Sequence, residues 1–227
     1  MGSWTAERWA AATGVGFAIL LVVANLIAGK PPKYNASAAR DVSWLHDKHK
    51  AILIGAILSG IAIVLFLWFL ASFAGTFREA GQRRLSTIMY GAGVATVTLA
   101  AAGEAVYVSL TRLSYFTDPK TVQGLFAVTS FVFAQIWWPV LALTLATVLA
   151  VRRSGVLPEW YAWLTIAGSV IFLIGGLSLK TTGFFSVTGG MSFIAFLVFA
   201  VWVLVSSVLL VQKTATVTMG APATSPM

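Results

Sequence analysis

One carboxylate has the greatest potential for chemistry, because it lies inside a long apolar stretch of the chain. Glu104 is the only acidic or basic residue well inside any of the six apolar stretches of the sequence. Charged groups in lipid are costly, usually face a bundle interior or a wet cavity, and commonly bind protons or substrates. Tyr107 and Thr111 follow at spacings that share one side of a helix. The three residues predict a polar patch near the end of this stretch.

Two more polar residues could join this patch around a cavity. Gln135 lies four residues before Pro139, which cannot donate to the Gln135 carbonyl and therefore predicts a kink. Lys180 follows the fifth stretch, which ends on the same side of the membrane as the third, so it could pair with Glu104. The candidate ligand- or proton-binding residues are thus Glu104, Tyr107, Gln135 and Lys180. The alternative interpretation is structural: an ion pair or wetted carboxylate at Glu104, and an ordinary membrane-helix proline at Pro139.

A histidine pair before the second stretch is a weaker candidate for binding a metal ion. His46 and His49 have the spacing of two ligands on one helical turn, and Asp41 or Glu104 could complete the set. Catalytic zinc sites usually have three protein ligands, and no third ligand is specified by spacing here, so no metal is predicted. Asp41 or Ser43 could instead cap a helical extension of the second stretch.

The motifs of the common enzyme and cofactor classes are absent from the sequence. With no cysteine, the chain cannot form disulfides, iron–sulfur clusters or a thiol nucleophile. It has no Gly-rich phosphate loop, no nucleophile elbow and no pair of catalytic carboxylates. No apolar stretch contains a histidine, which excludes haem held between two spans. We therefore predict no enzymatic activity and no cofactor.

The elements that must position Glu104 are the six apolar stretches themselves. They cover Trp9–Gly29, Ala51–Phe77, Leu85–Thr111, Gly124–Val151, Trp160–Leu179 and Met191–Gln212. Each has the length of about 20 residues that a helix needs to cross the hydrocarbon core. Only helices and closed barrels satisfy the backbone in lipid. The prediction is an all-α, polytopic, six-transmembrane-helix bundle.

The domain organisation follows from the same stretches. Residues 1–212 are predicted to form a single transmembrane domain, and the Thr-, Ala- and Pro-rich residues 213–227 a disordered tail. The second stretch contains Ala51, Gly55, Ala56 and Gly60, whose spacing is typical of close helix packing in membranes.

The positive charge of the chain is distributed over helix ends and short loops. The net charge is +8, but no loop is basic enough for a nucleic-acid footprint, so no nucleic-acid partner is predicted. Lys and Arg are almost evenly divided between the two sides, so the positive-inside rule alone does not orient the chain. The tight pairs Arg83-Arg84 and Arg152-Arg153 favour cytoplasmic termini.

Three further segments resemble a known family. These are residues 154–160, reading Ser-Gly-Val-Leu-Pro-Glu-Trp, then Asp118-Pro119, and the segment 202–210 of the last stretch. Together they resemble a group of six-span bacterial integral membrane proteins, mainly actinobacterial, which is catalogued as a domain of unknown function. The resemblance implies six spans, cytoplasmic termini and the bacterial plasma membrane. It implies no activity, cofactor or catalytic residue.

The function predicted from these observations is a binding role in the bilayer. The chain is expected to be an accessory or interaction subunit, or a binder of lipid or a small apolar ligand. Its partners would be the lipid bilayer and another membrane subunit or further copies of itself. The alternative is a small membrane carrier, proton-coupled through Glu104 in a polar cavity. A membrane enzyme acting on lipid-like substrates is a third and weaker hypothesis.

Overall fold

The computed structural model describes residues 6–33 and 35–219, and the side chains of residues 8–33 and 35–213. These residues form eight helices and no strand; an isolated backbone bridge joins Lys180 and Ser186. The helices are α1 (Ala6–Ala28), α2 (Ala38–Asp47), α3 (His49–Glu79), α4 (Arg83–Leu113), α5 (Pro119–Gln135), α6 (Trp137–Ser154), α7 (Glu159–Gly176) and α8 (Gly190–Met219). The all-α prediction is confirmed.

Six segments of the described chain are long and apolar enough to span a membrane. They are Arg8–Ala28, His49–Glu79, Arg83–Leu113, Pro119–Ser154, Glu159–Leu177 and Gly190–Lys213. Each matches one predicted stretch, so the six-span bundle is confirmed. The fourth span is built from two helices, α5 and α6, and α2 lies outside the spans.

The break between α5 and α6 has a local cause in the sequence. Pro139 has no N–H, so the Gln135 carbonyl cannot receive the usual helical hydrogen bond. The Ile136 N–H bonds to the Phe133 carbonyl at 3.3 Å, three residues back, and the regular pattern resumes when the Val140 N–H bonds to Ile136. The regular helical hydrogen bonding is therefore interrupted at Ile136, where α5 ends and α6 follows.

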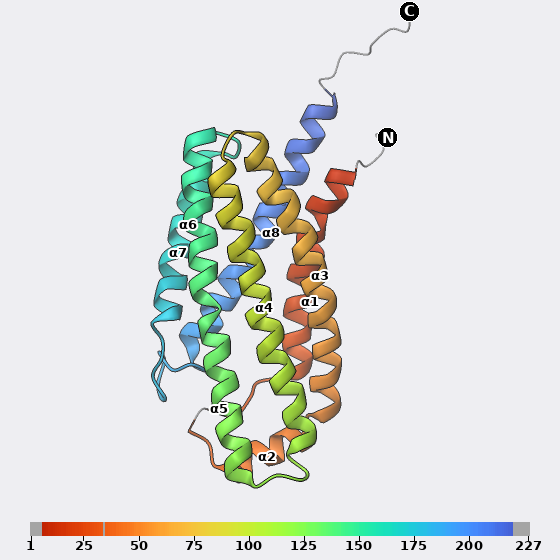
Figure 1. Cartoon of the computed structure of the whole chain (residues 1–227), viewed down its shortest axis with the longest axis vertical. Coiled ribbons are helices and arrows are strands. Elements are labelled where there is room, and N and C mark those ends of the chain that lie inside the picture. Colours follow the sequence, from red (N-terminus) through yellow and green to blue (C-terminus); the bar gives the residue numbers. More distant parts are fainter. Residues whose placement is uncertain (1–5, 34, 220–227) are drawn as a thin grey trace, which may run out of the picture.

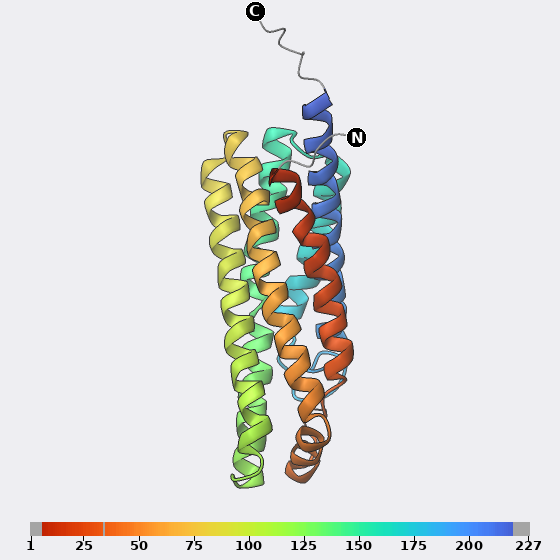
Figure 2. The same ribbon diagram turned by 90° about the vertical axis from the view of Figure 1, so that its right-hand side faces the viewer.

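The spans run side by side along one bundle axis (Figures 1 and 2). Their contacts form a closed ring of neighbours around an aromatic core. In ring order the packed helices are α1, α3, α4, α6, α7 and α8, with α8 returning to α1. At the centre, Phe66 and Phe73 of α3 meet Phe199 and Trp202 of α8. Because six spans are an even number, α1 begins and α8 ends at the same end of the bundle (Figure 1).

Hydroxyl groups also link the helices inside the ring. The Trp202 indole Nε1 donates to the Thr165 hydroxyl at 3.1 Å, which ties α8 to α7. The Ser169 hydroxyl donates to Thr144 at 2.9 Å, which ties α7 to α6. In lipid, such bonds stabilise helix association by about 0.6 kcal/mol on average.

Helix α2 packs at the opposite end of the bundle, beside the lower end of α5 in Figure 1. Trp44 and Leu45 of α2 are buried against Leu110 of α4 and Phe126 of α5. The Ser37 hydroxyl accepts from the Arg40 N–H at 3.3 Å and caps the helix. The predicted caps, Asp41 and Ser43, are therefore wrong: α2 begins earlier than the predicted extension.

The last helix extends beyond the predicted start of the tail. The sequence predicts a disordered segment from residue 213, but α8 continues to Met219. The physical reason is that the chain contains no Gly or Pro between Gly190 and residue 219, and extending an existing helix costs no new nucleation. Residues 220–227 of the predicted tail lie outside the described residues.

Candidate functional site

The carboxylate singled out by the sequence lies on α4 and faces α3. Glu104 is about 14 Å along the axis from the last residue of α4, at 1.5 Å per residue. Its side chain is partly buried, and the Ser59 side chain of α3 lies beside it in the same groove. A polar side chain from a neighbouring helix therefore accompanies this carboxylate within the span.

Glu104 and Ser59 lie in a groove between α3 and α4, with a volume of about 420 Å³. Small or apolar residues make up the rest of the walls: Ala56, Gly60, Ile63, Ala101, Ala105 and Val108. We call this the Glu104 groove. Gly60, Ala101 and Ala105 are exposed, so the groove opens on the outer surface of the ring.

The surface beside this groove is strongly apolar. Ile57 is 65% exposed and Val64 is 54% exposed, and both lie on the outer face of α3. Such a face suits lipid tails or another membrane helix rather than water. The Glu104 groove is therefore a polar point in an apolar exterior, not a water-filled cavity at the bundle centre.

The structure does not gather the four predicted site residues around one cavity. The Tyr107 ring packs against Trp44 and Phe126, with ring centroids 5.9 and 5.8 Å away, in the apolar cluster that α2 forms with α4 and α5. Gln135 is exposed at the end of α5. Glu104 alone of the four lines the groove.

Lys180 is also remote from Glu104 in the packing of the helices. It lies in the connection after α7, and its backbone bonds to Phe185 and Val187 within that same connection. Helix α7 packs against α6 and α8, whereas α4 packs against α3, α5 and α6. Glu104 lies beside Ser59 of α3 and not beside Lys180, because α6 lies between the third and fifth spans.

One residue of the histidine pair, His46, packs against an aromatic ring. The His46 ring stacks on Tyr115 with centroids 4.0 Å apart and planes at 14°. Within the described part of the chain, no group of three or more His, Cys, Asp or Glu side chains could hold a metal ion. His46 and His49 therefore stay unsupported as metal ligands.

Asp41 is an ionisable residue whose burial was not predicted from the sequence. Its side chain is 2% exposed on the inner face of α2, and Oδ1 has no hydrogen-bond partner among the described atoms. Loss of hydration raises the pKa of the Asp41 carboxyl above its ordinary value. Because the folded state then holds the proton more tightly than the unfolded state, stability is highest below the unfolded pKa. It declines as pH rises towards the folded pKa.

We expect Asp41→Asn to strengthen the docking of α2 at neutral pH and to remove this pH dependence, because the amide does not ionise. Amide hydrogen exchange of α2, compared between variant and parent at each pH from about 4 to about 8, measures the effect. Asp47→Asn, at an exposed position on the same helix, is the matched control. Weaker protection in Asp41→Asn at neutral pH would show that the carboxylate stabilises the fold.

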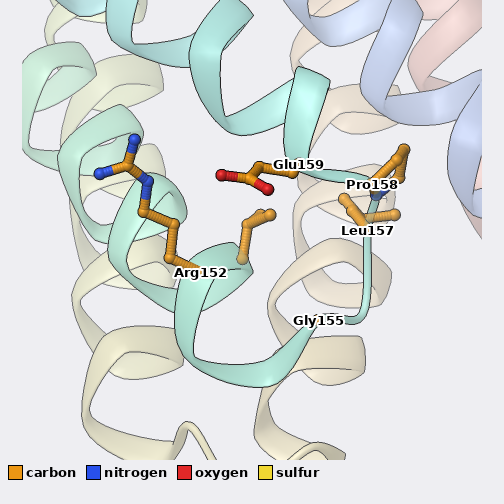
Figure 3. A pocket seen from close by; sticks show the side chains of 6 residues that line it. Arg152, Gly155, Leu157, Pro158 and Glu159 are labelled. Atoms are coloured by element: carbon orange, nitrogen blue, oxygen red, sulfur yellow. The ribbon is translucent and has the colours of Figure 1, made fainter.

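A second hollow, of about 650 Å³, lies at the turn between α6 and α7 (Figure 3). Its lining residues are Val151, Arg152, Gly155, Leu157, Pro158 and Glu159. Gly155 ends α6 with a φ of 62°, and the buried Leu157 anchors the turn. In the sequence, Arg152 served only to predict the orientation of the chain. The oppositely charged Glu159 close by in the sequence was the signal that could have indicated this hollow.

No family model, curated protein or solved structure matches the chain. The resemblance to the six-span actinobacterial group therefore stays a prediction. The helices themselves define a multi-pass, all-α membrane protein.

Proposed function

We propose that this protein is a non-enzymatic accessory subunit that binds a transmembrane helix of another membrane protein in the Glu104 groove. The observation that carries the proposal is the position of the Glu104–Ser59 pair. It lies between small residues on the outer surface of the ring, where a partner helix can reach it.

The walls of the groove have the chemistry that helix association in lipid requires. Ala56 and Gly60 on α3, and Ala101 and Ala105 on α4, are pairs four residues apart. Small residues at this spacing let two helix backbones approach closely, and packing drives association where lipid is as apolar as the side chains. Glu104 supplies a hydrogen-bond acceptor, so the partner helix should carry a donor side chain at this depth.

The carrier hypothesis has less support from the structure. It requires Glu104, Tyr107, Gln135 and Lys180 around one polar cavity, and of these four residues only Glu104 lines the groove. A carrier would also need a path through the ring, whereas the centre of the ring is filled by aromatic side chains.

We further propose that the termini lie in the cytoplasm of a bacterium and that the spans cross its plasma membrane. The turn between α3 and α4, and that between α6 and α7, lie at the end of the bundle where α1 begins and α8 ends (Figure 1). The pairs Arg83-Arg84 and Arg152-Arg153 adjoin these turns, and basic residues favour the cytoplasmic side.

Filling the groove tests the proposed function. We expect Gly60→Leu to reduce the amount of partner that co-purifies from gently solubilised native membranes by about tenfold, because the new side chain occupies the space of the partner helix. Glu104→Leu should also weaken the complex, through loss of the polar anchor. Gly91→Leu is the matched control, because Gly91 is exposed on α4 with nothing within 4 Å of a Cβ built there. An unchanged complex in Gly60→Leu would contradict the proposal.

A further inference from the structure

The hollow at the α6–α7 turn carries one cation and one anion on facing sides (Figure 3). Arg152 comes from the last turn of α6, and Glu159 from the first turn of α7. The Arg152 guanidinium lies over the Trp163 ring, 4.7 Å from its centroid, which holds the cation in position. Within the described residues, Arg152 and Glu159 form no ion pair with each other. Both charges are therefore available to a ligand.

The hollow lies at the level of the lipid head groups. The turn connects the ends of two spans, Pro119–Ser154 and Glu159–Leu177. Beside it, Trp160 and Trp163 are 53% and 59% exposed, as expected for the aromatic belt of a membrane interface. A lipid head group can reach this hollow without leaving the bilayer surface.

We propose that this hollow binds a phosphoethanolamine zwitterion, with its phosphate at Arg152 and its primary ammonium at Glu159. Arginine is well suited to phosphate, because its planar guanidinium donates two parallel hydrogen bonds. A carboxylate is acceptor-only, and an ammonium group offers it three donors. The volume of about 650 Å³ is typical of a small-molecule site.

The pairing of charges also determines which head groups are disfavoured. A phosphatidylglycerol head group offers the phosphate alone and leaves Glu159 without a cation. Its anionic charge is moreover repelled by the Glu159 carboxylate. A zwitterionic head group satisfies both side chains at once. The site is separate from the Glu104 groove and does not depend on the function proposed for that groove.

The test is native mass spectrometry of the full-length purified protein with phosphatidylethanolamine and with phosphatidylglycerol. We expect phosphatidylethanolamine to bind more tightly, and Arg152→Gln and Glu159→Gln each to weaken it about tenfold, the size of one lost charge-assisted hydrogen bond. Arg152→Lys should recover part of the binding. Arg153→Gln is the matched control, because Arg153 is also exposed and does not line the hollow. Thermal unfolding of each variant verifies that the fold is intact.

A competition experiment with soluble phosphoethanolamine distinguishes recognition of the head group alone from recognition of the whole lipid. If soluble phosphoethanolamine displaces the lipid, and Arg152→Gln weakens both, the hollow binds the head group chemistry itself. If only the lipid binds, with the same dependence on Arg152 and Glu159, the acyl chains are part of the recognition; either result supports the proposal. Equal binding of phosphatidylglycerol, or an equal loss in Arg153→Gln, would overturn it.

Discussion

Gly14→Ala is expected to destabilise the bundle by about 2 to 3 kcal/mol, although alanine is the better helix former. A Cβ at Gly14 would lie 2.7 Å from Cδ2 of Phe69 and 2.9 Å from Cβ of Ser207. Phe69 is fully buried among other rings, and the Ser207 Cβ is fixed to its backbone, so neither can move without displacing α3 or α8. Helix α1 must therefore shift outwards and lose the hydrogen bond from the Ser207 hydroxyl to the Ala11 carbonyl.

Gly75→Ala is the matched control for this prediction. Gly75 lies within α3, and nothing lies within 4 Å of a Cβ built on it. The same substitution should be neutral or stabilising there, by up to about 1 kcal/mol. Thermal unfolding of both variants in one lipid mixture measures the difference. A Gly14→Ala protein as stable as Gly75→Ala would show that α1 does not pack as closely as described.

Trp202→Ala is the second variant with a large expected effect, a loss of about 3 to 5 kcal/mol. The indole is 2% exposed, lies 5.7 Å from the Phe73 ring between centroids, and donates to Thr165. Removing it leaves a cavity at the junction of α3, α7 and α8, and leaves the Thr165 hydroxyl without this donor.

Two further variants separate the effect of lost packing from that of the lost hydrogen bond at Trp202. Trp202→Phe keeps much of the ring volume but removes the N–H, so we expect a loss of about 1 kcal/mol. Trp68→Ala removes an indole that is 63% exposed on α3, and its effect on unfolding should be small. Thermal unfolding of both variants measures the difference. Equal destabilisation by Trp202→Ala and Trp68→Ala would contradict the buried position of Trp202.

The spans were predictable from the sequence because their lengths and lack of charge leave the backbone no other solution in lipid. The position of Glu104 in the third span was predictable for the same reason. The side chain that lies beside it was not, because the order of helices around the ring decides which spans touch. Spans 3 and 5 end on the same side, yet α6 lies between them, so Lys180 is not the partner of Glu104.

The small residues of the second span show the same limit to prediction from the sequence. Gly55 and Gly60 have the same residue type and lie on one helix, and the sequence predicts close packing for both. In the structure, a Cβ at Gly55 would lie 3.2 Å from the Ala24 carbonyl oxygen of α1, whereas one at Gly60 would meet nothing within 4 Å. Only the packed fold distinguishes a helix contact that is already made from one that is still open.

The most direct test of the proposed function is site-specific photo-crosslinking in native membranes, with the reactive side chain in place of Ile57, which is exposed beside the Glu104 groove. We predict one discrete protein adduct from position 57, absent when Glu104→Leu is added, and no such adduct from the control position Gly91. Adducts with lipid alone at position 57, or the same protein adducts at positions 57 and 91, would contradict the proposal that the Glu104 groove binds a partner helix.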